Sequence, residues 1–129
     1  MNTAEFIKRV QSRASLDSRD AAIKATHATL ETLGQRLFGG EPSDLAAQLP
    51  RELAECLRQV SRRESFGLSE FYERISRKEG VEIEKASAHA QAVIEVLCDA
   101  VTQGEIDDIC SQLPGDFAAL FKKSGGTIH

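Results

Sequence analysis

The sequence has few of the residues that usually mark a disulfide-linked, metal-binding or membrane protein. Its 129 residues include 3 cysteines, 3 prolines, 1 tyrosine and no tryptophan. No apolar run approaches the roughly 18 residues of a membrane span, and the charged first ten residues lack the apolar stretch of a secretory signal. We therefore expect a cytoplasmic protein with no membrane contact.

The three cysteines do not form a recognisable framework. Cys56, Cys98 and Cys110 are odd in number and far apart, with no close cysteine pair and no histidine at short spacing. This spacing predicts neither disulfides nor a zinc site. We interpret all three as small hydrophobic core residues, and we expect no metal and no cofactor.

The charge balance is of the wrong sign for binding nucleic acid through the overall field of the protein. Sixteen basic and 20 acidic residues give a net charge of −4, which disfavours a phosphate backbone as partner. Residues 1–64 carry 10 basic and 9 acidic side chains, whereas residues 65–129 carry 6 and 11. Head-to-tail pairing of copies therefore stays open as an alternative to two ordinarily solvated faces.

The chain does contain enough apolar residues for a core, and their spacing is helical. Hydrophobic residues make up 41% of the sequence, and none of them forms the alternating run that predicts a strand. Phe6 and Val10, like Phe71 and Ile75, are four apart and so share one helix face. The sequence therefore predicts an all-α fold.

An internal repeat organises these helices into two copies. The pattern Glu5-Phe6-x-x-Arg9-Val10 returns as Glu70-Phe71-x-x-Arg74-Ile75, and Gln48-Leu49-Pro50 returns as Gln112-Leu113-Pro114. The other matched motifs are Leu16-Asp17 with Val81-Glu82, Leu30-Glu31-x-Leu33 with Ile94-Glu95-x-Leu97, and Gly40-Glu41-x-x-Asp44-Leu45 with Gly104-Glu105-x-x-Asp108-Ile109. The offset is 65 residues at first and 64 after one extra residue in the first copy, which indicates duplication of one helical unit.

Each copy is predicted to hold four helices. Repeat one spans 3–60 and repeat two spans 68–122, with the last helix of each copy at 50–60 and 114–122. A unit of this size buries too little surface to be stable alone. We therefore predict one domain, residues 1–123, in which two tandem four-helix repeats pack with pseudo-twofold symmetry, followed by a flexible tail, residues 124–129.

The order of these motifs resembles the bacterial family known as domain of unknown function 2267. The resemblance spans about residues 3 to 121, and the doubled Gln-Leu-Pro motif is its most specific feature. It implies an all-helical, cytoplasmic bacterial protein without an assigned activity. It carries over no catalytic residue. Gly115 and Asp116, which follow the second Gln-Leu-Pro motif, depart from the repeat pattern without changing this interpretation.

Two histidines lie at the edges of apolar stripes on the long helices. His27 and His89 could face each other as paired imidazoles that bind a metal or transfer protons near neutral pH. The repeat alignment argues against this, since His27 corresponds to Gln91 and His89 to Ala25. Glu31 lies four residues after His27, but no carboxylate lies three or four residues after His89 to form a matching ligand set. We therefore interpret both histidines as boundary residues.

Acidic residues recur at the starts of the short third helices. They are Glu41 and Asp44 in the first copy, and Glu105, Asp107 and Asp108 in the second. They lack the alternating spacing and central glycine of an EF-hand loop. We interpret them as helix-start carboxylates that complement the helix dipole. Thr102 and Glu105 also have the Thr-x-x-Glu spacing of a capping box at the start of the third helix of the second copy.

Basic residues cluster around the linker between the copies. The candidate interaction patch consists of Arg58, Arg62, Arg63, Arg74, Arg77 and Lys78. These side chains form one surface if the helices on either side of the linker pack side by side. Acidic neighbours dilute the patch, and pairs such as Glu70 with Arg74 are typical helix-supporting contacts.

No phosphate-binding loop, nucleophile elbow or metalloprotease motif occurs in the sequence. We therefore predict a protein without catalytic residues, acting as an interaction or oligomerisation module whose partner is itself or another bacterial protein. One alternative is a carrier or sensor that holds a small apolar ligand between the alanine-rich central helices. A second is a nucleic-acid-associated protein that uses the linker arginines.

Overall fold

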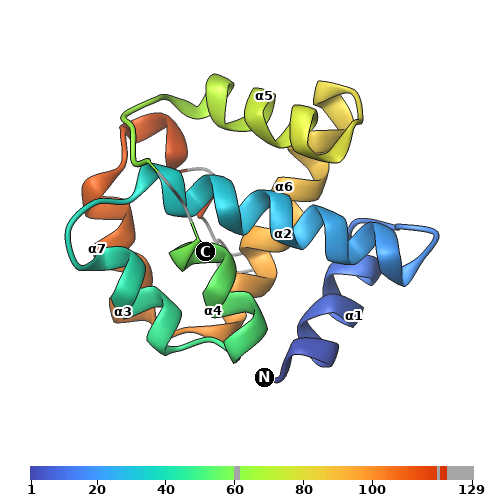
Figure 1. Ribbon diagram of the computed structural model, residues 1–129, viewed down its shortest axis with the longest axis horizontal. Helices are drawn as coiled ribbons and strands as arrows, with labels where there is room; N and C mark the ends of the chain where they lie inside the picture. The colour runs from blue at the N-terminus through green and yellow to red at the C-terminus, as the bar shows by residue number, and fades with distance from the viewer. Residues whose placement is uncertain (60–61, 119, 122–129) are drawn as a thin grey trace, which may run out of the picture.

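The computed structural model describes residues 1–59, 62–118 and 120–121, and these residues form helices and turns without a strand (Figure 1). The elements are α1 (Thr3–Arg13), α2 (Arg19–Arg36), α3 (Glu41–Ala47), α4 (Arg51–Arg58), α5 (Leu68–Glu79), α6 (Ile83–Ala100), α7 (Gln103–Gln112) and the 3-10 helix η1 (Gly115–Phe117). The all-α prediction is confirmed. Within the described part of the chain, no helix combines the length and hydropathy that crossing a bilayer requires.

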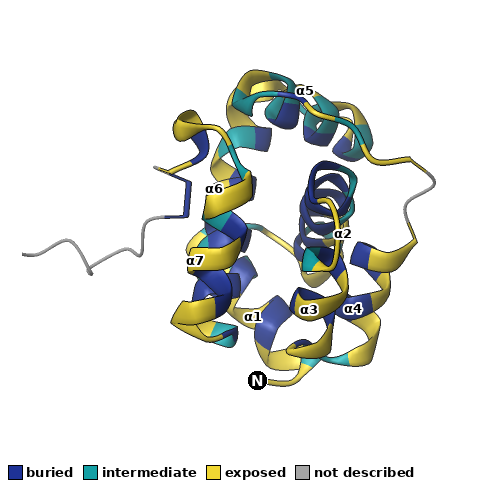
Figure 2. Cartoon of the chain, turned by 90° about the vertical axis from the view of Figure 1, so that its left-hand side faces the viewer, coloured by how far each residue is buried: buried dark blue, intermediate teal, exposed yellow. Residues whose placement is uncertain are grey.

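Helix α2 runs through the middle of the molecule. It contacts α1, α4, α5 and α6, and most of its residues are buried (Figure 2). Its alanines at 22, 25 and 28 are buried, as are those of α6 at 86, 90 and 92, and such small side chains let neighbouring helices approach closely. Thr26 and Thr32 are buried on α2 and donate their hydroxyl protons to the carbonyls four residues earlier. These two threonines are thus satisfied within the helix, whereas Thr29 Oγ1 is buried without a hydrogen-bond partner among the described residues.

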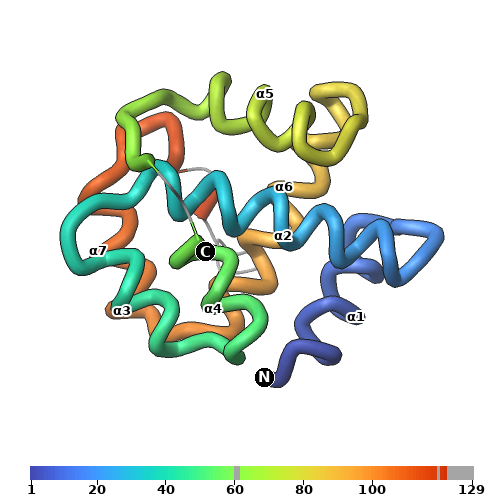
Figure 3. Tube along the Cα trace, viewed as in Figure 1, coloured from blue at the N-terminus to red at the C-terminus, as the bar shows by residue number. Residues whose placement is uncertain are grey.

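The first helix of each repeat packs on the long helix of both repeats. Helix α1 contacts α2 and α6, while α5 contacts α6 and α2 (Figure 3). Arg13 at the end of α1 reinforces one crossing through ion pairs with Glu95 at 3.1 Å and Asp99 at 2.9 Å. This reciprocal exchange is the pattern that pseudo-twofold packing requires. The symmetry itself, and the division into domain and tail, stay predictions.

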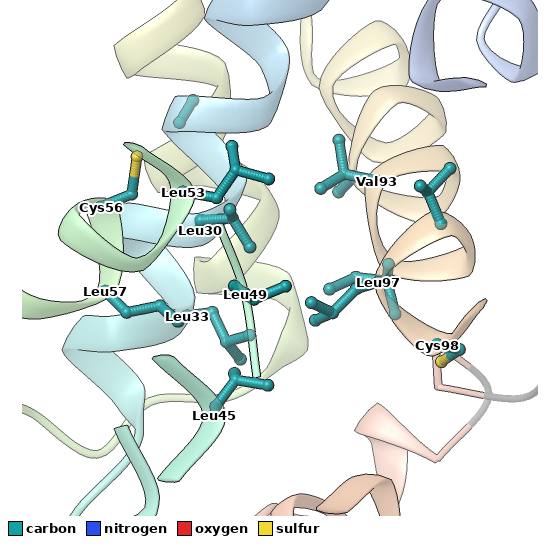
Figure 4. Packing of buried hydrophobic residues seen from close by; sticks show 14 of the residues in the cluster. Leu30, Leu33, Leu45, Leu49, Leu53, Cys56, Leu57, Val93, Leu97 and Cys98 are labelled. Carbon is teal, nitrogen blue, oxygen red and sulfur yellow. The ribbon is translucent and has the colours of Figure 1, made fainter. Parts of the chain in front are cut away.

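The shared core lies between the two halves. Leu30, Leu33 and Leu49 of the first half face Val93 and Leu97 of α6 (Figure 4). Four of these side chains are 0% exposed and Leu49 is 9% exposed. Each half thus covers apolar side chains of the other. This burial stabilises the fold by roughly 25 cal/mol for every Å² of apolar surface removed from water.

The repeated glutamine of the Gln-Leu-Pro motif joins the two halves. Thr102 N–H donates to Gln48 Oε1 at 2.9 Å, and Phe38 N–H donates to Gln112 Oε1 at 3.0 Å. Gln112 Nε2 also donates to the Phe38 carbonyl at 3.0 Å. Phe38 and Thr102 occupy the same place in the two repeats, 64 residues apart. Each glutamine therefore reaches the backbone just before the third helix of the opposite repeat, and we call these contacts the glutamine clamps.

The start of α7 follows the predicted capping pattern in one direction only. Thr102 is the N-cap, and its Oγ1 accepts from Glu105 N–H at 3.2 Å, as predicted. In a complete capping box the Glu105 side chain returns a bond to the Thr102 N–H. Here Gln48 occupies that N–H, which leaves the Glu105 carboxylate free for other contacts.

The prediction of a fourth α-helix in repeat two is wrong for the part of that segment that the structure describes. Pro114 is followed by the 3-10 helix η1 and turns at 118 and 120–121 instead of an α-helix. Gly115 lowers helix propensity. Asp116 Oδ2 accepts from Leu68 N–H at 3.2 Å and so caps α5. Phe117 is 1% exposed and packs edge-on against Phe71, with ring centroids 5.4 Å apart.

The linker is attached to the central helix. Glu64 N–H donates to the Gln35 carbonyl at 2.8 Å, and Arg36 Nε donates to the Phe66 carbonyl at 2.7 Å. In repeat one, α4 ends at Arg58. The expected helix ends at 60 and 122 and the tail at 124–129 lie outside the described residues.

The glutamine clamps generate a first prediction. Gln48→Ala and Gln112→Ala should each lower the free energy of unfolding by about 0.5–1.5 kcal/mol, because each removes hydrogen bonds between the halves. The double variant should lose close to the sum, since the clamps share no residue. Urea unfolding followed by circular dichroism measures this. Gln91→Ala is the matched control, since the side chain of Gln91 donates to Ser87 of its own helix and makes no bond between the halves among the described residues. Equal losses in all three single variants contradict the clamp.

Candidate functional site

A pocket of about 670 Å³ lies where the first turn of each repeat meets the start of its long helix. These two turns lie together at the right of Figure 1. The lining residues are Ala14, Ser15, Leu16, Asp17, Ser18, Ala21, Lys24, Glu79, Val81, Glu84, Lys85, Ala88 and His89. The volume is within the range of small-molecule sites.

Both turns use the same backbone reversal. Ser15 has φ 54° and Gly80 has φ 71°, so both adopt the left-handed conformation at equivalent places in the repeats. In each turn the next N–H closes onto a carbonyl five residues earlier, from Leu16 to Gln11 at 2.9 Å and from Val81 to Ser76 at 3.2 Å. The reversal brings the partly buried side chains of residues 16 and 81 onto the core and leaves the pocket between the turns.

A buried carboxylate and imidazole line this pocket. Glu79 is 6% exposed and His89 is 9% exposed, and Glu79 Oε1 lies 2.7 Å from His89 Nδ1. With an ionised carboxylate, the ring nitrogen is the donor. Glu79 Oε2 is buried and has no hydrogen-bond partner in the part of the chain that the structure describes. Burial raises the pKa of Glu79, while His89 and the charge of Lys24 act in the opposite direction.

The repeat alignment shows that this pair is a local departure from the duplicated pattern. Glu79 occupies the place of Ala14, and His89 occupies the place of Ala25. Both positions are alanine in the first copy, and both changes meet in one contact in the second. Sequence reasoning missed Glu79 because it searched for carboxylates near His89 on the same helix. The signal that could have found it is this pair of alanine replacements.

Charges of both signs surround the mouth of the pocket. Lys24 and Lys85 are basic lining residues, while Asp17 and Glu84 are acidic. None of the four forms a salt bridge within the described part of the chain. The apolar part of the wall comes mainly from residues 14, 16, 21, 81 and 88. Beside the Glu79–His89 pair, the pocket thus offers an apolar surface and four charged groups that are not paired with one another.

A second cluster forms where α3 meets α7, which lie at the left of Figure 1. Carboxylate oxygens of Glu41, Glu105 and Asp108 lie within 4.8 Å of one another. Glu105 is 7% exposed, and burial together with the nearby Glu41 and Asp44 raises its pKa to about 7. Glu41 Oε1 and Glu105 Oε2 are buried without hydrogen-bond partners within residues 1–59, 62–118 and 120–121. The dipole interpretation accounts for acidic residues at the helix starts, but it did not anticipate that three of the five converge.

The linker patch does not form as one surface, because α2 lies between α4 and α5 (Figure 2). Arg74, Arg77 and Lys78 of α5 gather around Gln35 in a shallow depression of about 330 Å³, away from Arg58 at the end of α4. Arg62 and Arg63 are exposed in the linker.

Three of the patch cations already have acidic partners, the first being Arg62, which lies 3.6 Å from Glu64. Arg74 lies 2.6 Å from both Glu64 and Glu70, and its guanidinium stacks 4.0 Å from the centre of the Phe66 ring. Lys78 lies 3.8 Å from Glu31. These contacts reduce the positive charge that the patch can offer to a nucleic acid.

The remaining candidates are not brought together. His27 is exposed, so it does not face His89. Cys56 and Cys98 are buried, as expected, but Cys110 is only partly buried. Burial raises the pKa of Cys56 to about 11 and also raises that of Cys110, which disfavours the reactive thiolate forms.

Comparison with known proteins agrees with the resemblance seen in the sequence. The model of a family described as "Uncharacterized conserved protein (DUF2267)" matches residues 3–120. The search of curated proteins gives no match.

The buried pair generates a second prediction. His89→Ala should lower the free energy of unfolding by about 1–3 kcal/mol at pH 7, since it leaves both oxygens of Glu79 without partners. A raised pKa means that folded Glu79 keeps a proton at pH values where the unfolded chain has released it. Stability therefore falls as pH rises between the pKa of Glu79 in the unfolded chain and its higher pKa in the folded chain. The loss in His89→Ala should therefore be smaller at pH 5 than at pH 7.

Urea unfolding at pH 5, 6, 7 and 8 measures this effect. His27→Ala, which removes an exposed histidine from the other long helix, serves as the control and should change stability little at any pH. A pH-independent loss, or equal losses in the two variants, contradicts the pair as described.

Proposed function

The chain belongs to this DUF2267 family, and because the family brings no activity, we propose a function from the pocket: the protein binds a small amphipathic molecule that carries an amine or another N–H donor. The proposal includes no turnover of the ligand. It develops the carrier or sensor alternative that the sequence left open.

The single observation that carries the proposal is the unpartnered oxygen of Glu79. A buried carboxylate oxygen without a hydrogen bond costs about 1–3 kcal/mol, and more when it is charged. His89 occupies the other oxygen at 2.7 Å and fixes the orientation of the carboxylate. A donor group on a ligand would satisfy Oε2 and recover that cost. Such a polar anchor beside an apolar wall is the usual composition of a ligand site.

The ligand proposed here differs from the apolar molecule expected at first. Small side chains of α2 and α6 are buried against their neighbours, and the pocket lies at the starts of these helices rather than along their alanine faces. It contains the Glu79–His89 pair and has Lys24 and Lys85 in its lining. These groups favour a ligand with both a polar end and an apolar body.

An interaction or oligomerisation module remains the second proposal. Among the described residues, the exposed large apolar side chains are Met1, Phe38 and Ile83, which come from separate places in the fold. A partner would therefore depend mostly on charged surface, such as the depression around Gln35. This observation favours the small ligand over a large hydrophobic interface.

Three probes with the same aromatic body test the ligand proposal. In ¹H–¹⁵N NMR titrations, 2-phenylethylamine and phenylalanine should shift amides of residues 14–18 and 79–89, whereas 3-phenylpropionate should bind at least about tenfold more weakly because it lacks the donor. Glu79→Gln should weaken amine binding by about tenfold or more. Equal binding of the amine and the acid, or no binding of any probe, contradicts the proposal.

Filling the pocket provides an independent arm of this experiment. Ala88→Leu places a larger side chain in the wall and should reduce binding of the amine. Ala47→Leu is the matched control, since Ala47 is exposed at the end of α3, outside the pocket. Native mass spectrometry of the protein distinguishes the second proposal, because an interaction module gives a multimer without an adduct.

A further inference from the structure

The carboxylates at the junction of α3 and α7 come from both halves of the chain. Glu41 begins α3, and Glu105 and Asp108 lie in the first two turns of α7. Glu41 and Glu105 occupy the same place in the two repeats, 64 residues apart. The duplicated motif therefore brings two copies of one carboxylate face to face, with a third beside them.

The protein itself does not neutralise this cluster. None of the three carboxylates has a lysine, arginine or histidine within salt-bridge distance among the described residues. Among the described residues, no hydrogen-bond donor reaches the buried atoms Glu41 Oε1 and Glu105 Oε2, and Glu105 as a whole is only 7% exposed. Burying like charges this close is costly unless a positive charge or a proton joins them.

The glutamine clamps hold the backbone on both sides of the cluster. Gln48 binds Thr102, whose Oγ1 accepts from the Glu105 N–H. Gln112 binds the backbone of Phe38, whose carbonyl accepts from the Glu41 N–H at 3.4 Å. The two carboxylates are thus positioned by contacts from the opposite repeat and do not depend on a ligand for their approach.

We propose that Glu41, Glu105 and Asp108 bind one divalent cation of the calcium, magnesium or manganese class across the two repeats. All three ligands supply oxygen, and no histidine or thiol belongs to the group, which favours hard cations over zinc. Asp108 is exposed, so water can complete the coordination. This site is separate from the Glu79 pocket and does not rest on the function proposed for it.

Thermal unfolding of the full chain at pH 7.5 tests the cation site. The melting temperature of the wild type should rise by about 4 °C or more in 5 mM CaCl₂ relative to EDTA, since a cation that binds only the folded state stabilises it. Glu105→Gln should remove this rise while unfolding in EDTA at or above the wild-type temperature, because it relieves repulsion. Asp107→Asn, a change at an exposed neighbour outside the cluster, should leave the rise intact.

Paramagnetic NMR locates the ion directly. Substoichiometric MnCl₂ should broaden amides near residues 41–44 and 104–108 in the wild type and in Asp107→Asn, but not in Glu105→Gln. Broadening elsewhere overturns the proposal, as does a melting temperature that is equal in CaCl₂ and EDTA or a rise that persists in Glu105→Gln. In those cases the carboxylates share a proton and bind no metal.

Discussion

The structure depends on burial of apolar side chains between two halves that are built alike. Helices α1 and α5 each pack on both long helices, so part of the cover for each half comes from the other. The clamps of Gln48 and Gln112 add hydrogen bonds at the same boundary. Directional bonds of this kind fix register, whereas the apolar contacts supply most of the stabilisation.

Both candidate sites lie at this boundary. The pocket forms at the starts of the two long helices, and the carboxylate cluster forms just after their ends. In the first case the repeats differ, since Glu79 and His89 replace Ala14 and Ala25. In the second case the predicted repeats agree, since Glu41 and Glu105 occupy matching positions and their carboxylates lie close together. The boundary between the two halves thus contains an asymmetric polar site, the Glu79 pocket, and a nearly symmetric one, the carboxylate cluster.

The local signals in the sequence predicted most helices correctly and failed where distant residues intervened. The Thr102 cap is present, but Gln48 takes the N–H that a capping box gives to Glu105. The last predicted helix is replaced by η1, because Asp116 caps α5. The linker patch is divided because α2 passes between α4 and α5.

Sequence alone determined the helical class and the family, predicted the duplication and contained no familiar catalytic motif, because these follow from residue spacing and order along the chain. Only the tertiary structure decided that Glu79 meets His89 and that Glu41 meets Glu105. Such contacts depend on how helices from the two repeats cross, and crossing geometry is set by packing of whole helix faces. The local periodicity of the sequence does not indicate which distant side chains are brought into contact by that packing.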